Sequence, residues 1–366
     1  MSSRILISRR GLGLALLSLA FLAPSSLAQG DAADVRSLVR SFRNRRASWD
    51  ERDAAARELL GAGPEGAMQL EKAASSEFAL RHKSWVKEEA GYLRSFESAA
   101  TKVGVARSRA ASALDVVAQR EELLKYSRSS GLSKAQVKSK CDPALANLER
   151  LLEVSVDDVL VSNSKIKEQR GDLLDEAMDL EWLAGLCGLA RSFMPAEDSQ
   201  GLVAVEFDSS VYKRLREIEG FMTLSGVATS ASDKGALAFN QALAEQLSPE
   251  EFKGLYELNR IRILAGIGAL KIDVKLCNAG RGHSKDMVEH GFFDHTSPLP
   301  GKTSPGDRSR LAGTSGGAEN IAAGQETGEG AIRAWWYSPG HHRNMMGGHA
   351  RVGLGRHQAH WTQMFG

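Results

Sequence analysis

The chain has 366 residues, a formal net charge of +2 and three cysteines. This length favours two domains over one, and the small charge argues against a nucleic-acid or anionic-surface partner. The three scattered cysteines, Cys141, Cys187 and Cys277, cannot close a full disulfide framework, although a bridge between Cys141 and Cys187 stays open. Stability is therefore expected to come mainly from packed cores, with the thiols buried separately.

Residues 1–28 have the pattern of a secretory signal peptide. A basic start precedes an apolar run over residues 11–23, and a small-residue stretch ends at Ala28. The arginine pair also matches part of a twin-arginine signal. The alternative is a membrane anchor, but the run is short for a span. We expect an exported protein with no transmembrane segment in the mature chain, located in the periplasm, in the cell envelope or outside the cell.

Residues 29–194 are predicted to form an all-α domain. Apolar residues recur at the spacing of one buried helix face, as in Val35, Leu38, Val39 and Phe42. The turn at Gly61–Glu65 and its flanks resemble one helical-repeat hairpin. Because solenoids need several stacked repeats, a single copy favours an ordinary helical bundle.

Residues 195–247 are predicted to be a connector, in which Leu202–Phe207 has the composition of a short strand. A new domain, residues 248–366, is expected to begin where Ser248, Pro249 and Glu251 give the signature of a capped helix. Eight of the nine histidines lie in this C-terminal part. It is therefore the part of the chain in which to look for chemistry.

Several motifs follow one another in this domain: "HSKDMVEHGFFDHTSP", "AENIAAG", "AIRAWWYSPGHHRNM", "RVGLG" and "HWTQ". Their order and spacing resemble the bacterial branch of the CAP superfamily (the SCP domain of cysteine-rich secretory, antigen 5 and pathogenesis-related 1 proteins). The resemblance implies an α-β-α sandwich, an antiparallel sheet between helical layers with a cleft on one side. The expected fold class is thus an α+β C-terminal domain preceded by an all-α helical domain.

The resemblance also implies that His295, Glu319 and His341 line the cleft. Ser338 and Pro339 stand where eukaryotic members carry a second glutamate, so that carboxylate is absent here. The apolar run after Glu319 places this residue at a helix start or a loop edge. Three residues are weaker candidates for the pocket, namely His283, Trp361 and Gln363.

Two imidazoles and a carboxylate suit a divalent metal such as zinc, and they equally suit a histidine base with an orienting carboxylate. The three positions form no local metal motif, so only the fold could bring them together. Ser338 is expected to cap a short helix with His341 at its third position. Successive helical residues point about 100° apart, so His342 should face elsewhere.

Three functions stay open. The first is an exported binding or interaction protein whose cleft takes a metal, a small molecule, a lipid or a protein, but no nucleic acid. The second is a metal- or histidine-assisted hydrolase acting on peptides or cell-wall material. The third is a structural protein whose function lies in the helical domain. A serine protease is excluded because no G-x-S-x-G elbow occurs, and Cys277 is expected to be an inert thiol.

Overall fold

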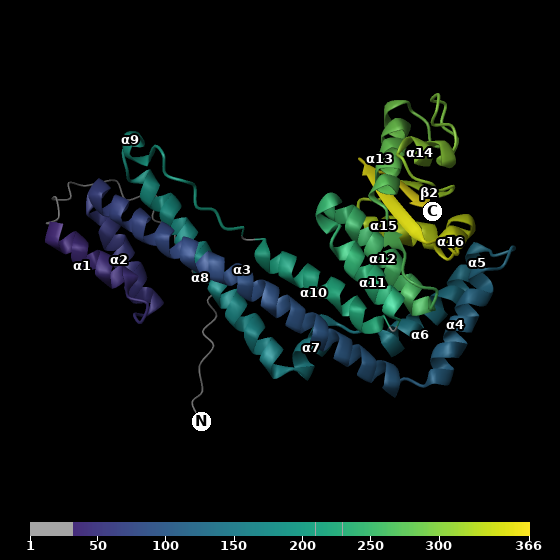
Figure 1. Cartoon of the computed structure of the whole chain (residues 1–366), viewed down its shortest axis with the longest axis horizontal. Helices are drawn as coiled ribbons and strands as arrows, with labels where there is room; N and C mark the ends of the chain where they lie inside the picture. Colours follow the sequence, from purple (N-terminus) through teal and green to yellow (C-terminus); the bar gives the residue numbers. More distant parts are fainter. Residues whose placement is uncertain (1–31, 209, 229) are drawn as a thin grey trace. The chain divides into compact units, whose positions relative to one another are not determined.

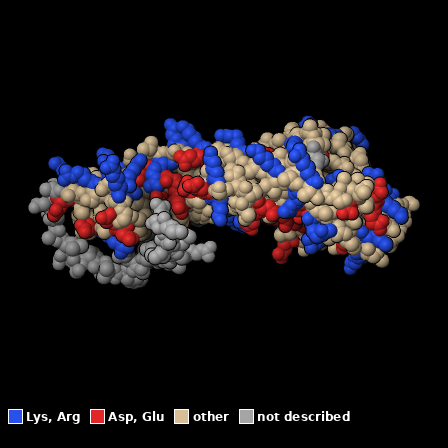
Figure 2. Space-filling view, turned by 90° about the horizontal axis from the view of Figure 1, so that it is seen from below, with Lys and Arg blue, Asp and Glu red and all other residues tan. Residues whose placement is uncertain are grey.

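A computed structural model describes residues 32–208, 210–228 and 230–366 of the chain (Figure 1). The predicted signal peptide, residues 1–28, lies outside the described residues. Within the described part, every helix is too short or too polar to cross a membrane. On the face shown in Figure 2, basic and acidic side chains are interspersed, in keeping with the small net charge.

The chain divides into two compact units. The first joins Met1–Glu89 to Asp172–Val211, and the second joins Ala90–Gly171 to Tyr212–Gly366. The boundaries fall inside two long helices, α3 and α8, and after Val211. The described part of the first unit is mainly helical and contains α1 (Ala32–Arg43), α2 (Trp49–Gly61), α9 (Ala196–Ser199) and parts of α3 (Gly63–Ala110) and α8 (Ser164–Ser192).

Residues 202–208, in the first unit, form no regular structure. The predicted strand at Leu202–Phe207 is therefore wrong. The segment is largely exposed, and it is not one of the four strands of the described sheet. Without a neighbouring strand, a run of β-branched residues has no partner for its backbone groups.

The second unit begins with helices that precede the C-terminal domain. These are α4 (Ala113–Ser127), α5 (Lys134–Gln136), the π turn η3 (Val137–Cys141), α6 (Asp142–Leu152), α7 (Val156–Ser162), α10 (Val211–Val227), α11 (Ala231–Gln241) and the 3₁₀ turn η4 (Ala244–Gln246). Leu123 and Leu148 from α4 and α6 share one core with Leu255 and Trp336. The three cysteines are buried and unbridged.

The C-terminal domain opens with α12 (Pro249–Ala265), and the predicted capping box between Ser248 and Glu251 is present. The remaining elements are β1 (Lys271–Ile272), α13 (Val274–Glu289), α14 (Pro305–Leu311), β2 (Ala318–Ala323), α15 (Gly328–Trp336), α16 (Pro339–Met345), β3 (Arg351–His357) and β4 (His360–Phe365). Helical structure followed by an α+β domain confirms the predicted fold class.

The described sheet has the strand order β1-β3-β4-β2. β2 and β3 run antiparallel to β4, while the two-residue β1 runs parallel to β3, so the sheet is mixed rather than wholly antiparallel. Glycines alternate with large residues along β3. A Cβ atom on Gly353 or Gly355 would collide with the backbone of α13, whereas Leu354 points to α12 on the other face. This alternation lets α13 pack closely and produces the layered sandwich (Figure 1).

Candidate functional site

Glu319 lies on β2, the edge strand of the sheet, rather than at the expected helix start or loop edge. Its side chain is 1% exposed, and its two carboxylate oxygens have different partners. The Nδ1 atom of His295 lies 2.9 Å from Oε1, and Arg308 donates from Nη2 to Oε2 at 2.6 Å. A buried carboxylate needs such partners, because desolvation without them is costly.

Arg308, on α14, is a site residue that the sequence did not reveal. It is buried, and besides Glu319 it donates hydrogen bonds to the carbonyl oxygens of His295 and Lys302, each at 2.9 Å. Its neighbour Arg310 is exposed and pairs with Asp307 on the same helix. Nothing in the "DRSR" sequence distinguishes the two arginines. Arg308 ties the loop that carries His295 to the strand that carries Glu319.

His295 combines a fixed ring with an accessible edge. The hydrogen bond to Glu319 raises the pKa of His295 above its ordinary value, although burial opposes the shift. The side chain is nevertheless 47% exposed, and within the described chain its Nε2 atom has no hydrogen-bonding partner. Because Nδ1 is occupied by Glu319, any further ligand or proton has to meet this imidazole at Nε2.

His341 is the third residue of α16, as predicted, and its ring centroid lies 6.3 Å from that of His295. Burial, together with the nearby His295, lowers the pKa of His341. Two asparagines join α16 to β2: Asn320 donates to the His341 carbonyl at 3.2 Å, and Asn344 donates to the Glu319 carbonyl at 3.1 Å. The fold therefore brings His295, Glu319 and His341 together at the edge of the sheet.

The weaker candidates lie around this cluster. The buried His283 has Nε2 3.8 Å from Glu319 and 3.1 Å from the Asp294 carbonyl, and burial lowers its pKa. Gln363 is buried and accepts a hydrogen bond from Asn320. Trp361 is also buried, and its indole donates to the Gln325 carbonyl. Gln363 and Trp361 are both fully buried.

The side chain of His342 points away from the site to which His341 belongs, as the helical geometry predicted. It is fully buried and faces α4, where its Nε2 atom meets the Ser127 hydroxyl. Ser338 is the residue before α16, but its side chain makes no capping hydrogen bond, so only its position agrees with the prediction. His283 and His290 also differ in exposure: His283 is buried within α13, and His290, just past the end of that helix, is exposed.

Two side chains of the candidate site, the imidazoles of His295 and His341, are available to bind a metal ion. Among residues 32–208, 210–228 and 230–366, no group of three or more histidine, cysteine or acidic side chains is arranged to hold one. In the site itself, both oxygens of Glu319 are engaged by His295 and Arg308. In this geometry Glu319 would act on a metal through His295, by orienting its ring, rather than as a direct ligand.

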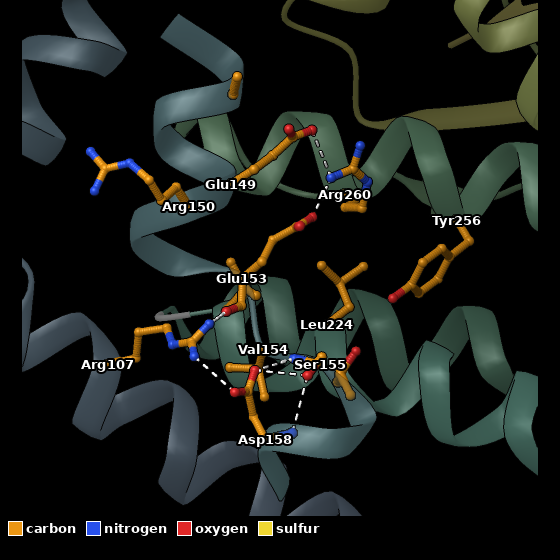
Figure 3. Close-up of a pocket in the computed structure, with 13 residues that line it drawn as sticks. Arg107, Glu149, Arg150, Glu153, Val154, Ser155, Asp158, Leu224, Tyr256 and Arg260 are labelled. Atoms are coloured by element: carbon orange, nitrogen blue, oxygen red, sulfur yellow. Dashed lines mark hydrogen bonds and ion pairs between the residues drawn. The ribbon is translucent and has the colours of Figure 1, made fainter. Parts of the chain in front are cut away.

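Two cavities in the second unit lie away from these residues. One of about 530 Å³ is lined by α6, α7, α10 and α12, and in it Arg260 points to Glu149 and Glu153 while Arg107 pairs with Asp158 (Figure 3). The other, of about 370 Å³, is mostly apolar and lies among α10, α11 and α12. Neither is lined by a predicted site residue.

The chain is similar to known proteins over about a third of its length. Residues 255–365 match the family model CAP, the cysteine-rich secretory protein family. The uncharacterized protein YkwD of Bacillus subtilis (strain 168) is 37% identical over 124 residues, 32% of this chain and 48% of that protein. The uncharacterized membrane protein YlbC of the same strain is 29% identical over 108 residues, 29% of this chain and 31% of that protein.

One solved structure is also similar to the chain. It is an extracellular protein containing an SCP domain from Bacillus anthracis strain Ames, 28% identical to this chain, with a TM-score of 0.30. The match covers 32% of this chain and 43% of that chain. The chain therefore spans half or less of the length of each relative that it matches.

Proposed function

Because the chain is a bacterial CAP-family protein, with the CAP domain at residues 255–365, we propose that it is an exported binding protein. Its ligand is taken up at the cluster of His295, Glu319 and His341. Export is supported by the basic, apolar and small-residue order of residues 1–28. The extracytoplasmic location follows from export.

The observation that carries this proposal is the anchored but accessible ring of His295. Glu319 holds Nδ1 at 2.9 Å, and Arg308 holds the other Glu319 oxygen at 2.6 Å, so the imidazole is positioned before a ligand arrives. The raised pKa of His295 favours a proton on Nε2, while the lowered pKa of His341 keeps that ring neutral. Together they offer a donor and an acceptor side by side.

Two kinds of ligand fit such a pair. An anionic group would accept a hydrogen bond from protonated His295. A divalent metal ion such as zinc would be held by the two imidazoles, with Glu319 orienting the first, and it would supply Lewis acidity to whatever bound next. Both ligands would contact His295 and His341. The anionic group requires a protonated His295, whereas the metal ion requires both imidazoles to be neutral.

The experiment uses the full chain without residues 1–28 and two probes, Zn²⁺ and inorganic phosphate, each titrated by calorimetry. We expect saturable binding of at least one probe, weakened about tenfold or more in His295→Ala and in His341→Ala. His290→Ala is the matched control, because His290 is exposed at the end of α13. The proposal fails if neither probe binds, or if binding survives both site substitutions.

A hydrolase is the second candidate, because a carboxylate 2.9 Å from Nδ1 is the arrangement that orients a histidine base. His295 would take a proton at Nε2, and Glu319 would stabilise the resulting imidazolium. Turnover of peptide or cell-wall material that falls about a hundredfold in His295→Ala would replace the binding role with catalysis. If binding and turnover are both absent, the helical region becomes the part of the chain to test.

A further inference from the structure

Ser127 and His342 form a buried hydrogen-bonded pair that the candidate site does not use. Both residues are fully buried. The Nδ1 atom of His342 lies 2.8 Å from the Trp336 carbonyl, and its Nε2 atom lies 2.8 Å from the Ser127 hydroxyl. A carbonyl can only accept, so Nδ1 carries the proton and the Ser127 hydroxyl donates to Nε2. The pair is thus a defined, neutral arrangement in the core.

The pair joins two distant parts of the sequence. Ser127 is the last residue of α4, well before the matched region at residues 255–365. His342 is the next residue after His341 on the seven-residue helix α16. A hydrogen bond from α4 to α16 therefore ends one residue away from an imidazole of the candidate site.

Further contacts support α16 and the end of α15 from the same direction. The Trp336 indole donates to Asp142 at 2.6 Å, and its ring lies 4.2 Å from that of His342, centroid to centroid. Lys138 lies over the Tyr337 ring at 5.7 Å. All of these partners come from residues 127–142, which we call the helical brace.

We propose that the helical brace positions α16, and that Ser127 and His342 are the positioning pair that fixes His341 opposite His295. On one side α16 is tied to β2 by Asn320 and Asn344, and on the other it is tied to α4 by His342. A short helix that is held from two sides is fixed in one position. Loss of the Ser127 hydroxyl would leave the buried Nε2 atom of His342 without its hydrogen-bond donor.

The pair has the residue types of a catalytic serine–histidine dyad but cannot act as one. Neither side chain has exposed surface, so a substrate cannot reach the hydroxyl. The geometry instead assigns it a role inside the core. The burial that lowers the pKa of His342 agrees with a ring that stays neutral.

The test compares Ser127→Ala with Ser127→Thr, which keeps the hydroxyl, in the full chain without residues 1–28. The readout is the pKa of each histidine ring, from NMR titration. In Ser127→Ala we expect the pKa of His341 to rise toward its ordinary value, because a loosened α16 exposes the ring to water. Ser127→Thr should restore the wild-type pKa of His341.

This inference rests on the proposed function only for its second readout. There, the affinity for Zn²⁺ or phosphate should fall about fivefold in Ser127→Ala and recover in Ser127→Thr. If the wild type binds neither probe, the proposed function fails while the NMR titration still tests the brace. A folded Ser127→Ala protein with an unchanged His341 pKa overturns the positioning role. If Ser127→Ala does not fold, Ser127→Cys, which nearly keeps the volume but donates weakly, takes its place.

Discussion

Glu219 on α10 and Glu319 on β2 are both buried carboxylates of the second unit, and each is bound by one arginine. Glu219 receives Arg170 Nε at 2.7 Å and the Tyr92 hydroxyl at 2.6 Å. Glu319 receives Arg308 and the Nδ1 atom of His295. The two clusters therefore solve the same desolvation problem with the same kind of contacts.

The clusters differ in their third member. Tyr92 is 3% exposed, and burial together with Glu219 raises the pKa of its phenol far above the physiological range. His295 is half-exposed, and its hydrogen bond to Glu319 raises its pKa above the ordinary value of a histidine. The Glu219 cluster, whose third member is a buried phenol, stabilises the packing of the helices. The Glu319 cluster includes an accessible imidazole that can change its protonation state, so a ligand can bind there.

The largest loss of stability is expected when the Glu219 cluster is broken. Glu219→Gln leaves Arg170 beside a neutral group in the core, and we expect the free energy of unfolding to fall by about 3–5 kcal/mol. Urea unfolding followed by circular dichroism measures it. The pKa of His295 should stay at its wild-type value, and a change there would mean that the two clusters are not independent.

Glu319→Gln should also destabilise the protein, by about 3 kcal/mol, because Arg308 is as buried as Glu319. Unlike Glu219→Gln, it should also weaken probe binding, since His295 loses its anchor. Urea unfolding and calorimetry on the same sample separate the two losses. A variant that is as stable as the wild type would contradict the buried pairing with Arg308.

A smaller effect is expected from Arg308→Lys. Lysine keeps the charge but lacks the planar fork that reaches Glu319, His295 and Lys302 together, so we expect a loss of about 2 kcal/mol. Arg310→Lys is the matched control on the same helix and should stay within about 0.5 kcal/mol. Equal losses in the two variants would remove the bracing role of Arg308.

The smallest expected effect is the pH dependence that His295 gives to the free energy of unfolding. Its pKa is higher in the folded chain than the unfolded value of about 6.5, so the folded state binds this proton more tightly. The contribution of His295 to the free energy of unfolding is complete below a pH of about 6.5, and it is lost as the pH rises through the pKa of His295 in the folded chain. His341, whose pKa is lowered, acts in the opposite sense: its contribution is present above pH of about 6.5 and is lost as the pH falls.

His295→Ala should therefore destabilise the protein more at pH 5.5 than at pH 8.5. Because the side chain is half-exposed, the difference should be only about 0.5 kcal/mol. Urea unfolding at the two pH values measures it, with His290→Ala as the control. A loss that grows with pH has the wrong sign and would refute the assigned charge state of His295.

Local pattern was enough to predict part of this structure. The "SPEE" sequence predicted the capped start of α12, and the 100° step of a helix separated His341 from His342. Motif resemblance named His295, Glu319 and His341, which the fold brings together. The short apolar run after Glu319 misled, because such a run fits a strand as well as a helix start.

The site and brace residues that the sequence did not reveal, Arg308 and Ser127, are recognisable only from their contacts in the folded chain. Arg308 matters because its guanidinium meets Glu319 on β2, and the exposed Arg310 has the same local sequence context. Ser127 meets His342 215 residues later in the chain. A hydrogen bond of this kind leaves no periodicity or motif in the sequence, so only the packed structure could reveal it.

The most direct test of the account is the NMR pH titration of the His295 ring in the wild type and in Glu319→Gln. We expect a wild-type His295 pKa above 6.5 and above that of His341, and a lower His295 pKa in the variant. A wild-type His295 that titrates below His341, or a value that Glu319→Gln leaves unchanged, would contradict the claim that Glu319 prepares this imidazole for a ligand.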